Sequence, residues 1–202
     1  FVQSERIGGS SYVSGVRSVV FGYSAGGTQL IVAVGYSARA NQNDSTVVGA
    51  FAVSNAIRSV VIGRSANVGS ANAAGIAIGY SANASGVSVS MAIGNFAIAS
   101  GSQSFSIGSS ATATGTRDMA IGSASDATGN NSLAVGYSAQ ATGSAAIALG
   151  SESVADSTYG FAMGYRANNN GHAASVAIGG LDAQNTTDRQ VVFGGTQAPV
   201  EY

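Results

Sequence analysis

Short apolar runs that end in glycine recur along the chain at a nearly constant interval. Leu133-Ala134-Val135-Gly136 and Ile76-Ala77-Ile78-Gly79 are typical runs. We call the glycine that ends each run a marker glycine, and the markers are Gly8, Gly22, Gly35, Gly49, Gly63, Gly79, Gly94, Gly108, Gly122, Gly136, Gly150, Gly164, Gly179 and Gly194. Most intervals between markers are 14 residues, and all lie between 13 and 16. This period predicts stacked copies of one small unit.

Each unit contains two short segments of β-strand length. The first is the apolar run before the marker glycine, and the second is an alanine-rich run such as Ser138-Ala139-Gln140-Ala141-Thr142-Gly143. Glycine, asparagine and serine separate the segments, as turns require. The short segments and frequent glycine disfavour helices. We therefore predict two strands and two tight turns per unit, with turn insertions in the longer intervals before Gly79, Gly179 and Gly194.

The two predicted strands differ in the polarity of their faces. In the second strand, alanine alternates with threonine, glutamine, asparagine, arginine or serine, which predicts one buried and one exposed face. In the first strand, the residues one and three positions before the marker are large and apolar. The residue between them is usually alanine, so neither face is polar. A strand without a polar face is expected to be covered on both sides.

Stacked units of this kind build two narrow parallel sheets that lie back to back, with about 4.8 Å between successive coils. Only one face of each strand can point into such a roll. The other apolar face of the first strand would form a continuous exposed stripe, which predicts self-association along it. The pattern leaves open which apolar layer faces inward and how many copies associate.

Composition excludes several classes of function. Only 8% of the 202 residues are charged, against about 25% in an average protein. The formal net charge is −1 and all eight basic residues are arginine, which gives no electrostatic footprint for nucleic acid or an acidic membrane. Cysteine is absent, so disulfides and thiolate metal sites are excluded. No apolar run is long enough for a membrane-spanning helix, so we expect no membrane insertion by this segment.

Enzymatic chemistry finds little support in the sequence. The segment Gly22-Tyr23-Ser24-Ala25-Gly26 fits the G-x-S-x-G pattern of serine hydrolases, but that pattern needs a strand–turn–helix elbow and a triad. The same serine recurs in other units without the last glycine, at Ser37, Ser81 and Ser138. The single histidine, His172, follows an asparagine-rich segment and is interpreted as a solvated loop tip. We predict no catalytic, cofactor-binding or metal-binding residues.

The tyrosines that directly follow marker glycines are the remaining candidate contact residues. These are Tyr23, Tyr36, Tyr80, Tyr137 and Tyr165. Stacking of adjacent coils would align Tyr23 with Tyr36 in a ladder. Tyrosine is common in recognition surfaces, but it can equally cap the end of a narrow roll, and we favour the capping role.

The repeated phrase Ser175-Val176-Ala177-Ile178-Gly179, followed in other copies by x-x-Ser-x-Ala-x-Gly, resembles the head repeat of YadA-like trimeric autotransporter adhesins. The resemblance extends from about Arg6 to Gly194. It implies an all-β fold, a left-handed parallel β-roll of about 14-residue coils with two short strands each, assembled as a homotrimer. Residues 1–202 would form a single β-roll domain, and we expect them to be a fragment of a longer fibrous protein.

The resemblance also implies a function. Members of the family are non-enzymatic virulence proteins of the bacterial cell surface, anchored in the outer membrane through a region that this sequence lacks. They attach to host cells, extracellular matrix or other bacteria, so a host surface protein, a matrix protein or a glycan is the expected receptor, and no cofactor is expected. The same repeat occurs in bacteriophage tail fibres, which leaves a structural or receptor-binding fibre segment of a virion as the alternative.

A third function considered is ice binding by a flat, regular solenoid face. It would require the same small residue or threonine in register on most coils. The outer positions of this chain instead mix arginine, glutamine, asparagine, threonine, isoleucine and valine, which argues against it.

Overall fold

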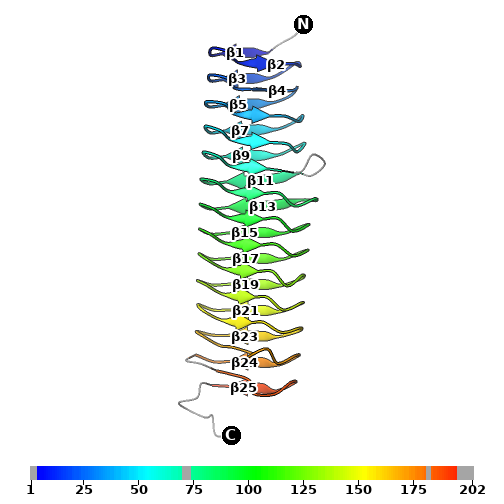
Figure 1. The fold of residues 1–202 in the computed structure, drawn as a ribbon, viewed down its shortest axis with the longest axis vertical. Coiled ribbons are helices and arrows are strands. Elements are labelled where there is room, and N and C mark those ends of the chain that lie inside the picture. The colour runs from blue at the N-terminus through cyan, green and yellow to red at the C-terminus, as the bar shows by residue number, and fades with distance from the viewer. Residues whose placement is uncertain (1–3, 70–73, 181–182, 195–202) are drawn as a thin grey trace. The chain divides into compact units, whose positions relative to one another are not determined.

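The computed structural model describes residues 4–69, 74–180 and 183–194, and it is built from short parallel β-strands (Figure 1). The chain divides into two compact units, Phe1–Gln103 and Ser104–Tyr202. Each unit is a solenoid in which two strand types alternate along the chain and form two separate sheets. Within the described residues, no helix is long and apolar enough to cross a membrane.

In the first unit, the strands before the marker glycines form one sheet, which we call sheet A. Its strands are, in spatial order, β1 (Glu5–Ile7), β3 (Val19–Phe21), β5 (Val32–Val34), β7 (Thr46–Val48), β9 (Val60–Ile62), β11 (Gly75–Ile78) and β13 (Ser90–Ile93). The alanine-rich strands form sheet B. Its strands are β2 (Tyr12–Val13), β4 (Gly26–Gly27), β6 (Arg39–Ala40), β8 (Val53–Ser54), β10 (Asn67–Val68), β12 (Asn83–Ala84) and β14 (Ile98–Ala99).

The second unit repeats this arrangement. Its sheet A contains β15 (Phe105–Ile107), β17 (Met119–Ile121), β19 (Leu133–Val135), β21 (Ile147–Leu149), β23 (Phe161–Met163), β24 (Val176–Ile178) and β25 (Val191–Phe193). Its sheet B contains β16 (Thr112–Ala113), β18 (Asp126–Ala127), β20 (Gln140–Ala141) and β22 (Val154–Ala155). Two single bridges, Val154 to Asn168 and Asn168 to Gln184, continue sheet B beyond β22.

The register between strands follows the sequence repeat. Leu133 pairs with Ile147, Ala134 with Ala148, and Val135 with Leu149, all in parallel. In these strands each repeat position therefore lies beside the same position of the next coil. This confirms the predicted all-β solenoid with two short strands per coil.

The structure answers which apolar layer faces inward. Alanines at the middle position of the sheet A strands, such as Ala120 and Ala134, are fully buried between the two sheets. Alanines of the second strands, such as Ala127 and Ala141, are fully buried opposite them. The core consists mainly of alanine, with serine and valine at some positions, so it is a layer of small side chains.

The large apolar residues of sheet A point outward. The sequence predicted cover on both faces of these strands. Within each described unit, the chain itself covers only the alanine face, because the roll has room for one layer of small side chains.

Two corners connect the strands in each coil, and left-handed backbone conformations form both. At the glycine corner, Gly136 has a φ of 139° and Ser138 a φ of 50°. A Cβ on Gly136 would lie 2.4 Å from the carbonyl oxygen of Gly150 in the next coil, so only glycine fits there. The opposite corner, which we call the second corner, also places residues in the left-handed region, for example Arg117 and Ala145.

Candidate functional site

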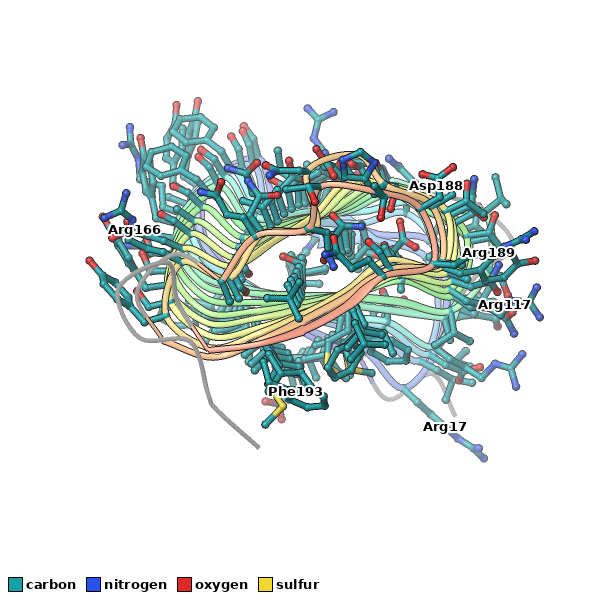
Figure 2. All side chains as sticks on the ribbon, turned by 90° about the horizontal axis from the view of Figure 1, so that it is seen from below. Arg17, Arg117, Arg166, Asp188, Arg189 and Phe193 are labelled. Atoms are coloured by element: carbon teal, nitrogen blue, oxygen red, sulfur yellow. The ribbon has the colours of Figure 1, made fainter. Side chains whose placement is uncertain are left out.

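The outward face of sheet A is the first candidate interaction surface. In the second unit its two rows contain only apolar residues: Phe105, Ile107, Met119, Ile121, Leu133, Val135, Ile147, Leu149, Phe161, Met163, Val176, Ile178, Val191 and Phe193. Met163 remains 46% exposed and Phe193 50% exposed. Phe193 projects from this face, away from the roll interior (Figure 2).

A contiguous apolar face of this kind is unusual on a soluble monomer. In the first unit the same face is mostly apolar, with Thr46 and Glu5 as polar members. Residues of one row lie about 4.8 Å apart along the stack, because parallel strands have that spacing. The regular rows can interdigitate with a second copy of the same face, which would remove these side chains from water.

A second candidate surface is a row of aromatic side chains at the glycine corner of the first unit. We define the aromatic row as Tyr23, Tyr36 and Phe51. The Tyr23 and Tyr36 rings are stacked, with centroids 5.6 Å apart and planes 13° apart. The Phe51 ring meets Tyr36 edge-on, with centroids 5.3 Å apart. The predicted ladder of Tyr23 and Tyr36 is therefore confirmed.

The tyrosine pattern in the sequence does not include the phenylalanines of this corner. Phe51 and Phe96 come two residues after their marker glycines, whereas the tyrosines come one residue after theirs. Phe96 meets Tyr80 edge-on at 5.1 Å, and the Arg64 guanidinium lies 5.8 Å from the centre of the Tyr80 ring. Both phenylalanines have a left-handed backbone, with φ near 60°, which a reading of side-chain patterns alone does not anticipate.

The serine of the G-x-S-x-G segment occupies a repeated structural position. Ser24 has a φ of 53°, the conformation that Ser37, Ser81 and Ser138 share. Its N–H donates to the Gly9 carbonyl at 3.1 Å, and strand β4 follows instead of a helix. A nucleophile elbow requires a helix after the serine, so this geometry does not provide one.

His172 is partly buried and has polar contacts, in contrast to the predicted solvated loop tip. Its side chain is 31% exposed, and its Nδ1 lies 3.4 Å from Oδ1 of Asp188. The hydroxyls of Ser157 and Ser175 donate to its carbonyl oxygen at 2.7 and 2.6 Å. No group of three or more histidine, aspartate or glutamate residues that could hold a metal ion occurs in the described part of the chain.

Two aspartates of the second unit were not singled out by the sequence pattern. Asp118 is fully buried, and its Oδ2 and Oδ1 accept hydrogen bonds from the N–H groups of Gly115 at 2.7 Å and Ser132 at 2.9 Å. Burial raises the pKa of Asp126, and the nearby Asp118 raises it further. Oδ1 of Asp126 is buried without a hydrogen-bond partner within the described residues. Asp118 stands where most units have serine, four residues before the marker, and this was the available signal.

Comparison with known families gives one match. The model described as YadA head domain repeat, in two copies, matches residues 32–52, 73–88, 90–111, 113–139 and 141–167. These segments together cover more than half of the chain, and each contains one or two marker glycines. No curated protein matches the chain.

Proposed function

The chain belongs to the family of YadA head domain repeats, and from this premise we propose that it is the head of a homotrimeric adhesin on the surface of a bacterium. The family is a non-enzymatic family of surface-exposed adhesins of outer-membrane autotransporters. The head attaches the cell to host cells, extracellular matrix or other bacteria. The homotrimer and the receptor are parts of the proposal.

The observation that carries the proposal is the outward face of sheet A. Its rows of valine, isoleucine, leucine, methionine and phenylalanine are half-buried or exposed in each single unit. Three copies that turn this face toward a common axis would bury these rows, at about 25 cal/mol per Å² of apolar surface removed from water. Three identical heads also present every outer contact three times, so weak contacts gain by avidity.

The assembly is tested with two valine variants that differ only in the sheet they occupy. Val135 is half-buried on the outward face of sheet A, and Val154 is half-buried on the outward face of sheet B. We expect light scattering after size exclusion to give a trimer for the unmodified chain and for Val154→Asp. Val135→Asp is expected to give monomers, because three buried carboxylates would meet near the axis.

A monomeric unmodified chain at micromolar concentration would contradict the trimer, as would a trimer that survives Val135→Asp unchanged. Attachment is tested separately by displaying the chain on a non-adherent bacterium. We expect binding to cultured host cells, to immobilised matrix proteins or to cells that display the same chain. Display without any of these would indicate a purely structural shaft and would exclude the adhesin function.

A further inference from the structure

A cavity of about 560 Å³ opens at the second corner of three consecutive coils in the second unit. It is lined by Thr158, Tyr159, Ala173, Ala174, Asp188 and Arg189. Asp188 and Arg189 lie together at this corner, opposite the corner that carries Arg166 (Figure 2). The volume falls within the range of about 300–1,000 Å³ that small-molecule sites occupy.

The cavity arises from one small residue in a stack of large ones. Tyr159, Ala174 and Arg189 occupy the same corner position in successive coils, with φ values of 59°, 52° and 57°. The Ala174 N–H donates to the Thr158 carbonyl and the Arg189 N–H to the Ala173 carbonyl, both at 2.9 Å. Tyr159 and Arg189 are therefore two coils apart, about 9.6 Å at the backbone. The alanine between them leaves a notch open.

The walls of the notch carry complementary chemistry. Tyr159 is 68% exposed and offers a ring face. Oδ1 of Asp188 accepts a hydrogen bond from the Ala173 N–H at 3.0 Å and lies 3.4 Å from His172, which orients the carboxylate while its side chain stays 69% exposed. Within the described residues, the Arg189 guanidinium and the Thr158 hydroxyl make no hydrogen bond, so both remain available to a ligand.

We propose that this notch binds one neutral pyranose ring of a glycan. The ring lies between Tyr159 and Arg189, since two contacts of about 3.5–4.0 Å fit within the two-coil spacing. Asp188 accepts hydrogen bonds from two neighbouring sugar hydroxyls, while Arg189 and Thr158 donate to sugar oxygens. The inference rests on the proposed attachment function and specifies one class of receptor for it.

The polar groups favour a sugar over an aromatic side chain of a protein partner. An aromatic ring in the notch would cover the Asp188 carboxylate without returning donors to it, which costs free energy. A pyranose presents an apolar C–H face to Tyr159 and hydroxyl donors at its edge to Asp188. Asp188 and Arg189 carry opposite charges, so the notch has no net charge that would require an acidic sugar.

The test uses saturation-transfer NMR on the full chain with the methyl pyranosides of galactose, glucose and mannose as probes. We expect transfer to at least one probe, and at least about tenfold weaker binding for Tyr159→Ala and Asp188→Asn. Ala174→Tyr fills the notch and should abolish binding. The corner tolerates this residue, because Tyr159 itself has the same backbone conformation.

The matched control is Ala145→Tyr, which makes the same change at the same corner position, one coil before Tyr159 and outside the cavity. Unchanged binding in this control and lost binding in Ala174→Tyr would support the site. Absence of transfer to all three probes, or equal binding by both tyrosine variants, would overturn it. If cells that display Ala174→Tyr adhere as well as cells that display the unmodified chain, the notch is not the receptor site. Trimer mass and attachment to matrix proteins, measured on the same variants, report the proposed function independently.

Discussion

Replacement of Gly136 by alanine tests the glycine corner on which the coil geometry depends. Gly136 has a φ of 139°, a conformation that residues with a side chain rarely adopt. The added Cβ would lie 2.4 Å from the Gly150 carbonyl oxygen and 2.5 Å from its carbon. Ordinary contacts between such atoms are about 3.5–4.0 Å. The two coils would therefore have to separate by about 1 Å at this corner.

The expected cost combines backbone strain with lost hydrogen bonds. A residue held in a sparsely populated backbone region costs about 1–3 kcal/mol. The separation also weakens the bonds from the Gly150 N–H to the Val135 carbonyl and from the Glu152 N–H to the Tyr137 carbonyl, both 2.8 Å long, at about 1 kcal/mol each. The free energy of unfolding should fall by about 3–5 kcal/mol. For a chain of this size that lowers Tm by about 10 °C.

The matched control is Gly180→Ala. A Cβ at Gly180 would meet no atom of the described residues within 4 Å, and the residue does not need a positive φ. Its Tm should stay within about 2 °C of the unmodified chain. Both variants are compared by thermal circular dichroism at equal protein concentration, because association makes Tm depend on concentration.

Hydrogen exchange adds a spatial readout. In a repeat protein each coil contacts mainly its neighbours, so Gly136→Ala should lower protection around β19 and β21 and leave distant coils unchanged. A Tm for Gly136→Ala within 2 °C of that of Gly180→Ala would refute the argument. A uniform loss of protection along the whole chain would refute its local part.

Two further predictions concern side chains outside the corners. Burial and Asp118 raise the pKa of Asp126 above 3.8, so folding favours its protonated form. The contribution of Asp126 to the free energy of unfolding is therefore fully present below about pH 3.8 and is lost as the pH rises through the folded-state pKa. Asp126→Asn should therefore raise Tm at pH 7 and leave it unchanged at pH 3, and an equal shift at both pH values would exclude the charge as its cause. Tyr36→Ser removes both ring contacts of the aromatic row, so the free energy of unfolding measured by urea titration should fall by about 1–3 kcal/mol. If the row only caps the roll, adherence of cells that display this variant should be unchanged. Lost adherence with unchanged stability would instead identify the row as a recognition surface.

The sequence was sufficient to predict the strand pattern because one constraint repeats in every coil. All fourteen marker glycines have a positive φ, as residues that turn the chain beside a neighbouring backbone must. Alternation along the second strand correctly placed alanines such as Ala141 in the interior. The pattern could not orient the first strand, since both of its faces are apolar and periodicity alone gives them equal weight.

The candidate surfaces were less accessible to sequence reasoning. The notch between Tyr159 and Arg189 depends on which residues of successive coils share a corner. The 15-residue interval before Gly179 shifts these residues by one position relative to a strict 14-residue repeat. The interaction of Asp126, in β18, with Asp118, which directly precedes β17, arises between residues that lie eight positions apart in the sequence. Such contacts between residues depend on the register of the stacked coils, which cannot be read from a single sequence.

The alanine interior has a consequence for how such a chain changes length over generations. Alanine has no side-chain rotamers to match, so an interior of alanine accepts any other coil of the same kind as its neighbour. Duplication or deletion of a 14-residue stretch leaves the parallel register, the corner conformations and both outer rows intact. Unequal recombination within the gene can therefore lengthen or shorten the molecule by whole coils, and each product folds without a compensating mutation.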